Sequence, residues 1–211
     1  MKYIFVTGAP GSKFSSVCRN FYFSSDIDHS DFIPEYMSFK TIHGEKQLMH
    51  LGAYFDPQPY INIDFDRFSE YSKAELEAEF DRFFSGDGIR IIKGHAFCHH
   101  LDFIRGTWPD CPIVLADRHD DACLGWWMLC GNFNIDYPKF TRWKSFEEVG
   151  FNIKKQNKDL RDFVQKSKTT QVYDNIELCT KIGIKLPPRT EYDKIYIHNY
   201  AANDIKIYLS Y

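Results

Sequence analysis

Residues 3–16 read YIFVTGAPGSKFSS, and this stretch decides the fold that the sequence predicts. A continuous apolar run ends at Gly8, and the loop that follows is made of small residues and carries Lys13. A buried strand, a tight turn and a helix are the expected local structures. Backbone N–H groups in such a turn point inward, and the helix dipole adds positive charge, so the turn suits a phosphate group. An ordinary strand-to-helix turn punctuated by Gly and Pro is the alternative.

Length and composition limit what the chain can be. The 211 residues fit a single domain, residues 1–211, and 44% hydrophobic residues are enough for a sizeable core. No run of 18 apolar residues and no signal peptide are present, so we expect a cytoplasmic protein without membrane contact. The net charge of −3 argues against nucleic acid as a partner. The six cysteines are scattered, which predicts reduced thiols; a monomer or a homodimer fits equally.

Hydrophobic periodicity outlines the remaining elements. Strands are expected at 3–7, 89–92, 112–116, 195–197 and 205–208. Helices are expected at 14–23, 72–84, 100–105, 120–130, 145–166 and 172–182. Irregular structure is expected at 24–64, with short strands near 39–42 and 60–64, and a loop at 131–144. Alternating strands and helices predict an α/β fold, a three-layer α/β/α arrangement with a mainly parallel sheet like that of P-loop NTPases.

Polar residues follow three of the predicted strands. The phosphate loop follows the first, Lys93 and His95 follow strand 89–92, and Arg118 follows strand 112–116. Because ligands bind beyond the carboxyl ends of parallel strands, we expect these groups to share one site. His95, Cys98, His99 and His100 crowd together and raise the alternative of a zinc site. No second cluster completes a tetrahedral ligand set, so no metal is expected.

The loop departs from the Walker pattern G-x-x-x-x-G-K-[ST] when the count runs back from Lys13. Thr7 and Ser12 then stand where the glycines belong, and Phe14 stands where a hydroxyl residue binds magnesium. The stretch from Gly8 to Ser12 resembles the start of the adenylate kinase loop, with one Gly missing before the Lys. Kinase chemistry is therefore disfavoured, although a nucleotide or small-molecule kinase with a degenerate loop stays an alternative.

Residues 7–16 resemble the 5′-phosphosulfate loop of sulfotransferases, which use 3′-phosphoadenosine 5′-phosphosulfate and have a P-loop-like fold. In that family a strand is followed by Pro, a basic residue, Ser, Gly and two hydroxyl residues. Ser12, Ser15 and Ser16 match, whereas Gly11 replaces the basic residue and Lys13 stands two places later. The resemblance is greatest to the short, diverged members of bacteria and phages. It implies that the donor is bound by Gly8, Ala9, Pro10, Gly11, Ser12, Lys13, Phe14, Ser15 and Ser16.

Two further segments are similar to the same family. Lys93-Gly94-His95 is similar to its Lys-x-His at the end of an interior strand. Residues 113–127 resemble its 3′-phosphate segment, in which a strand ends in Arg and an acidic residue and a Ser follow. Arg118 matches the Arg, and Asp121 matches the acid after a one-residue deletion. Gly125 stands where the family has Ser.

The resemblance implies transfer of a sulfuryl group from 3′-phosphoadenosine 5′-phosphosulfate to an acceptor hydroxyl. Lys13 would stabilise charge on the leaving phosphate oxygen, and Lys93 would assist at the sulfuryl oxygens. His95 would remove the acceptor proton, and Arg118 would bind the 3′-phosphate through its planar fork. The family needs no metal. For Arg118, an ion pair with Asp120 or Asp121 is the alternative.

Aromatic residues are the candidates for binding a carbohydrate or small-molecule acceptor. One group is the loop at 50–60, and the other is Trp126, Trp127, Phe133, Tyr137 and Trp143. Aromatic clusters are more often part of a core, which is the expectation for Trp126. A non-catalytic nucleotide-binding protein of the same fold is the third functional hypothesis, and it is favoured by the two Gly departures.

Overall fold

The computed structural model describes residues 1–42, 45–55, 60–130, 145–189 and 199–211. Its main feature is a five-stranded mixed sheet in the order β4-β1-β5-β7-β6. The strands are β1 Tyr3–Gly8, β4 Arg90–Lys93, β5 Ile113–Arg118, β6 Thr169–Val172 and β7 Ile205–Ser210. β1 pairs in parallel with β4 and β5, and β7 runs antiparallel to β5 and β6. The expected α/β fold with a mainly parallel sheet is confirmed at this level.

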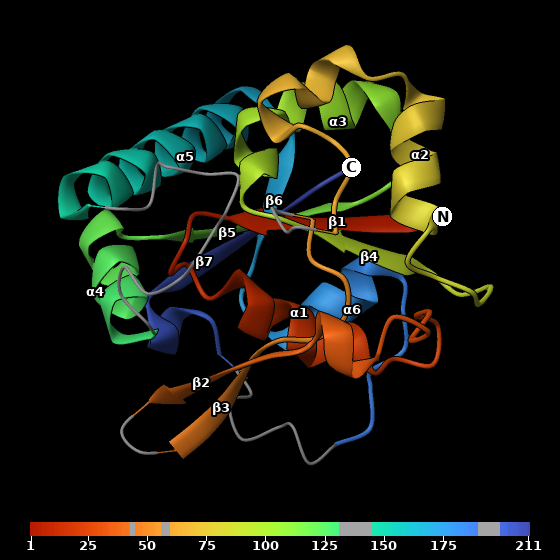
Figure 1. The fold of residues 1–211 in the computed structure, drawn as a ribbon, viewed down its shortest axis with the longest axis horizontal. Coiled ribbons are helices and arrows are strands. Elements are labelled where there is room, and N and C mark those ends of the chain that lie inside the picture. The colour runs from red at the N-terminus through yellow and green to blue at the C-terminus, as the bar shows by residue number, and fades with distance from the viewer. Residues whose placement is uncertain (43–44, 56–59, 131–144, 190–198) are drawn as a thin grey trace.

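Helices cover both faces of the sheet (Figure 1). One face carries α1 Phe14–Tyr22 and α6 Asn175–Ile182, and the other carries α2 Lys73–Asp81, α3 Leu101–Thr107 and α5 Phe146–Lys166. Side chains of β1 alternate between the two cores, as a strand covered on both sides requires. Ile4 and Val6 pack in the core of the α1 face, whereas Tyr3 and Phe5 pack in an aromatic core beneath α2, α3 and α5.

Helix ends follow local capping signals. Ser72 and Glu75 form a capping box at the start of α2, as the sequence predicts. Gly183 adopts a left-handed conformation and ends α6. The expected helix at 172–182 is wrong at its start, because Val172 ends β6 and Asp174 caps α6 through the amide of Glu177.

Other expectations for the irregular region are settled in part. The strand near 39–42 exists as β2 Ser38–Ile42, which pairs with β3 Glu45–His50. The strand expected at 60–64 is not formed. The expected loop at 131–144 and strand at 195–197 lie outside the described residues. Among the residues that are described, no helix is long and apolar enough to cross a membrane.

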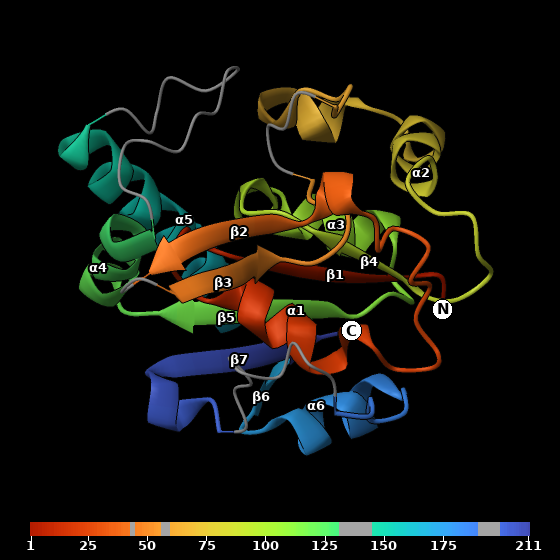
Figure 2. The ribbon, with the colours of Figure 1, turned by 60° about the horizontal axis from the view of Figure 1, so that its bottom comes forward.

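β1 and β5 are neighbours in the sheet, and the chain leaves their carboxyl ends towards opposite faces (Figure 1). β1 leads into α1 on one face of the sheet, and β5 leads into α4 Asp120–Cys130 and then α5 towards the other face (Figure 1). Neighbouring strands that leave in opposite directions mark a ligand-binding crevice in α/β sheets. The β2–β3 hairpin and α4 lie at this carboxyl edge of the sheet (Figure 2).

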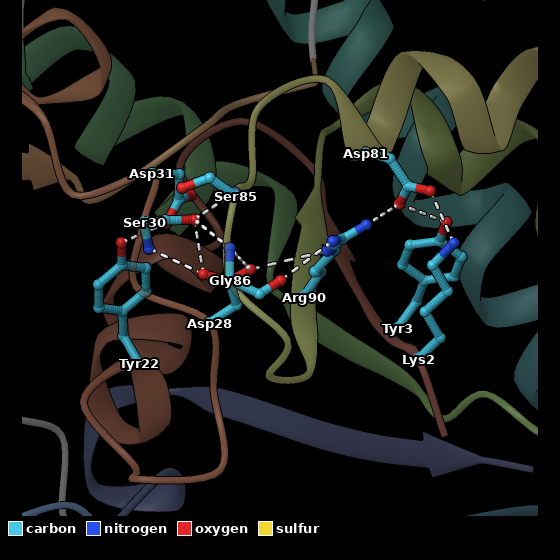
Figure 3. A network of polar contacts seen from close by, with 10 residues as sticks. All are labelled: Lys2, Tyr3, Tyr22, Asp28, Ser30, Asp31, Asp81, Ser85, Gly86 and Arg90. Carbon is cyan, nitrogen blue, oxygen red and sulfur yellow. Dashed lines mark hydrogen bonds and ion pairs between the residues drawn. The ribbon is translucent and has the colours of Figure 1, made fainter.

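The opposite edge of the sheet holds a network of charged groups (Figure 3). Arg90 at the start of β4 contacts Asp81 at the end of α2 and Asp28 in the segment after α1. Lys2 and Tyr3 at the start of β1 also bond to Asp81, at 2.6 and 2.7 Å. The network therefore ties β1, β4, α2 and the segment after α1 together at the amino edge, away from the β1–α1 loop.

Candidate functional site

The loop between β1 and α1 folds through two left-handed residues. Gly11 has φ of 81°, and Lys13, which caps α1, has φ of 64°. Between them the amide of Ser12 donates to the carbonyl of Ala9 at 2.9 Å. A side chain at Gly11 would place its Cβ 2.0 Å from the carbonyl oxygen of Cys123 in α4. Gly11 is therefore required both by its backbone conformation and by close contact with α4.

The backbone indicates a register of the Walker pattern different from the count back from Lys13. Counted forward from Gly8, Lys13 takes the place of the second Gly, and its positive φ is the conformation that favours Gly. Phe14 then takes the place of the Walker Lys, and Ser15 takes the place of the hydroxyl residue. The two counts differ by one residue. The hydroxyl position is filled, and the residue missing from the pattern is the phosphate-binding Lys.

Donors around this loop have no acceptor within the described part of the chain. The amides of Gly11, Lys13, Phe14 and Ser15 donate no hydrogen bond there. The Oγ of Ser12 is fully buried and also lacks a partner among these residues. Buried hydroxyl groups without partners are uncommon, so a bound acceptor would complete the loop. The arrangement fits an anion with several oxygens.

Lys13 lies on the α4 side of the loop. Its Nζ is 4.8 Å from the ring centroid of Trp126, within the range of a cation–π contact. Burial, followed by the nearby Arg118 guanidinium, lowers the pKa of Lys13. An anion placed near both cations would relieve their repulsion. Trp126, expected in the core, instead contacts the Lys13 side chain.

Arg118 at the end of β5 binds the same loop. Its Nη1 donates to the carbonyls of Gly11 and Ala122, at 3.0 and 3.1 Å. Its Nε is buried and makes no hydrogen bond within the described residues. The alternative ion pair with Asp121 is not formed, since that side chain is 85% exposed and lies 3.7 Å from His119. Asp121, predicted to be part of the site, is therefore directed into solvent.

The acidic residues beside Arg118 are bound by α5. Asp117 accepts a hydrogen bond from Arg161 at 2.9 Å. Asp120 accepts from Asn157 at 2.7 Å and lies 3.3 Å from Arg161. Neither carboxylate pairs with Arg118, whose guanidinium contacts the loop instead.

His95 comes within reach of the loop from β4. Its Nδ1 lies 2.7 Å from the carbonyl oxygen of Gly8. Because a carbonyl only accepts, Nδ1 carries the proton, and a neutral ring then has its lone pair on Nε2. The ring is buried against Phe14 and Tyr54, with centroid distances of 4.7 and 5.7 Å. His95 is therefore held in the tautomer that a general base at Nε2 requires.

Lys93 does not join the loop. It is almost fully buried on the α1 face, its Nζ donates to the carbonyl of Leu51, and it lies 5.8 Å from the ring of Tyr22. Burial lowers the pKa of Lys93, and nearby Cys18 and Asp31 oppose that effect. Lys93 therefore belongs to a buried polar cluster and does not face the loop where the sulfuryl group is expected to bind.

The alternative zinc cluster is not assembled. His99 pairs with Asp159 at 2.6 Å, His100 bonds to the carbonyl of Phe65 at 2.8 Å, and Cys98 lies against Thr7. Within the described ranges, no three His, Cys, Asp or Glu side chains are grouped so that they could hold a metal ion. All six cysteines are free thiols and buried.

A cavity of about 550 Å³ adjoins Arg118 at the carboxyl ends of β5 and β6 and the amino end of the antiparallel β7. Its lining includes Arg118, Arg161 and Lys206, and the aromatic side chains of Tyr173 and Tyr200. Asp204, also in the lining, contributes to the electrostatic environment of Lys13. A charged residue of the cavity lining therefore interacts electrostatically with a residue of the loop.

His50 is a site residue whose role the sequence did not reveal. Its Nδ1 lies 2.9 Å from the Oγ of Ser15, although the two residues are 35 positions apart. The sequence placed His50 only in an aromatic loop. Its position at the end of β3 depends on how the hairpin packs on α1, which no local signal specifies.

Comparisons with known proteins provide no family for this chain. It matches no protein-family model, no curated protein and no solved structure.

Proposed function

We propose that the protein is a transferase that binds 3′-phosphoadenosine 5′-phosphosulfate and moves its sulfuryl group to an acceptor hydroxyl. One observation carries the proposal. Arg118 from β5 and His95 from β4 both bond to carbonyls of the β1–α1 loop, at Gly11 and Gly8. A phosphate-type loop, a guanidinium and an imidazole of defined tautomer thus lie together at the end of β1. Sulfuryl transfer uses this set of groups.

The groups present fit the donor molecule. The unpartnered loop amides and the Ser12 hydroxyl suit its 5′-phosphate. The Nε and unused N–H groups of Arg118 suit the 3′-phosphate. The adjoining cavity, with Tyr173 and Tyr200 in its lining, is of a size that accepts a nucleoside.

The chemistry asked of the protein is transfer of the sulfuryl group between two oxygens. The donor, when bound, supplies a sulfuryl group on a phosphate leaving group. His95 Nε2 accepts the proton of the acceptor hydroxyl as its oxygen bonds to sulfur, and the sulfur–oxygen bond to the phosphate breaks. Lys13 and the loop amides stabilise charge on the departing phosphate oxygen.

The kinase alternative is weaker because Phe14 occupies the Walker Lys position. That side chain is buried in the core of the α1 face, so it cannot contact phosphate oxygens. A kinase also needs an acidic side chain at a strand end to hold magnesium. Asp117 on β5 could serve, but it accepts a hydrogen bond from Arg161.

A non-catalytic nucleotide-binding protein is the second candidate. Two observations favour it. Lys93 is buried away from the loop, and one guanidinium nitrogen of Arg118 already donates to the loop carbonyl of Gly11. This candidate predicts binding without transfer.

Thermal stability in the presence of ligands tests the proposal. Adenosine 3′,5′-bisphosphate, the product nucleotide, is expected to raise the melting temperature more than ATP with magnesium does. Equal shifts, or none, would overturn the proposal. A labelled donor and a panel of hydroxyl acceptors then separate transfer from binding alone.

His95→Asn tests the general base. The Asn amide keeps an N–H donor near the position of Nδ1 and removes Nε2, so bisphosphate binding should persist. Transfer should fall at least 100-fold, the usual contribution of a general base being roughly 10²–10⁴. His95→Ala, which removes the loop contact as well, should also weaken binding. Undiminished transfer in His95→Asn would show that His95 is not the base.

A further inference from the structure

The hydrogen bond between His50 and Ser15 brings an ionisable group to the start of α1. Ser15 is the second residue of this helix, next to the loop amides that lack acceptors. The His50 ring is held there by Tyr54, with 4.3 Å between the ring centroids. An element distant in sequence, the β2–β3 hairpin, thus contributes a side chain to the loop.

The direction of this hydrogen bond depends on the tautomer and the charge of His50, since Nδ1 accepts when it is bare and donates when it carries a proton, in the neutral Nδ1–H tautomer or in the cation. A serine hydroxyl has one hydrogen to donate. When Nδ1 is bare, the hydrogen of Ser15 goes to His50 and is lost to any bound anion. When His50 is protonated, Nδ1 donates to Oγ, and the hydrogen of Ser15 is released towards another acceptor. The protonated ring also adds a positive charge.

Counted from Gly8, Ser15 stands at the hydroxyl position that ligates Mg²⁺ in P-loop NTPases. Here the partner of that hydroxyl is an imidazole. We propose that protonated His50 is a positioning residue of the loop: it directs the Ser15 hydroxyl to a bound phosphate or sulfate group and supplies positive charge beside it. The inference rests on the proposed function, because it names what completes the same anion site.

The surroundings of His50 couple its protonation to binding. Arg19 and Lys93 donate to the carbonyls of Leu48 and Leu51, on either side of His50 in the chain. The ionisable groups on the strand of His50 and on the elements that contact it include Lys46, Cys18, Arg19, Tyr54 and His95. A positive charge on His50 and an anion bound at the loop attract each other. Anion binding and protonation therefore favour each other.

Inorganic sulfate is the probe, because it stays a dianion from pH 5.5 to 8.5. Calorimetric titration of the full chain should give an affinity that falls with rising pH, by up to about tenfold per pH unit for one linked proton. His50→Gln keeps an N–H donor for Ser15 without a titrating charge, so its affinity should not vary with pH in this way. His29→Gln, in the segment after α1 and bonded to the carbonyl of Tyr22, should keep the wild-type pH dependence.

A second measurement does not depend on the variants. The ring protons of His50, followed by NMR, should titrate at higher pH with saturating sulfate than without it. Equal pH dependence in wild type and His50→Gln, or an unchanged His50 titration, would overturn the role of His50. If adenosine 3′,5′-bisphosphate still binds in that case, the proposed function stands. If neither anion binds at any pH, both proposals fall.

Discussion

At the scale of single residues, Gly8 decides whether the loop can form. A Cβ at this position would lie 2.4 Å from Ser12 Oγ and 2.6 Å from the carbonyl oxygen of Ala116 on β5. Gly8→Ala should therefore lower the free energy of unfolding by about 1–3 kcal/mol, the usual cost of overpacking. Urea denaturation measures it.

Gly125→Ala in α4 is the matched control for Gly8. Nothing lies within 4 Å of a Cβ there, so the change should stabilise α4 by about 0.5–1 kcal/mol through helix propensity. If Gly8→Ala behaves like Gly125→Ala, the close packing of the loop against β5 is wrong.

Residue identity and residue role were predictable to different degrees. The small residues after β1 and the exit positions of His95 and Arg118 follow from strand endings in the sequence. The direction of Lys93 does not, since consecutive strand residues face opposite sides and the pattern Lys-Gly-His does not fix which side faces the loop. The left-handed conformation of Lys13 could not be predicted either, because a positive φ is rare for Lys and no sequence signal indicates it.

At the scale of elements, His100 lies between η3 Ala96–His99 and α3, and its burial there should make the stability of the protein depend on pH. Burial lowers the pKa of His100, and its Nε2–H donates to the carbonyl of Phe65. Below the ordinary His pKa of about 6.5, His100 binds a proton in the unfolded chain but less readily in the folded chain. The free energy of unfolding should therefore fall as pH decreases through that value.

His100→Gln isolates this effect, because the Gln amide can keep the bond to Phe65 without titrating. Urea denaturation at pH 8 and pH 5.5 should show a smaller loss of stability for the variant than for wild type. An equal loss would mean that His100 is protonated in the folded state at pH 5.5.

Elements were predictable where a local signal coincided with a periodic pattern. The capping box of α2 and the terminal Gly of α6 are such cases. At 172–182, apolar spacing hid the boundary between β6 and α6, although Asp174 and Glu177 have capping spacing. β3 was missed because its pairing with β2 and its packing near α1 are long-range contacts. The position of His50 in the site depends on them.

At the scale of the whole molecule, the two edges of the sheet have separate tasks. At the carboxyl edge, Ser12 Oγ and Arg118 Nε have no hydrogen-bond partner among the described residues. At the amino edge the charged groups contact one another (Figure 3), although Arg90 Nε makes no hydrogen bond there. Asp28, almost fully buried, accepts from Ser30 at 2.6 Å and from Gly86 at 3.1 Å, and lies 3.7 Å from Arg90. Stability should therefore be adjustable at one edge without loss of binding at the other.

Arg90→Met tests this separation. It removes charged contacts to Asp28 and Asp81, so the free energy of unfolding should fall by about 2 kcal/mol, bonds to charged groups being worth roughly 1.5–3 kcal/mol. The affinity for adenosine 3′,5′-bisphosphate should stay within about twofold, because the substitution removes no contact of the β1–α1 loop. A tenfold change in Kd would need a change of about 1.4 kcal/mol in binding free energy.

Arg67→Met is the control for losing a surface charge. More than half of each side chain in its pair with Glu70 is exposed, so the loss of stability should be much smaller than in Arg90→Met. A loss of bisphosphate binding in Arg90→Met at temperatures where the variant is fully folded would contradict the separation. It would mean that the tilt of β1 and β4, fixed at the amino edge, is transmitted along both strands to Gly8 and His95.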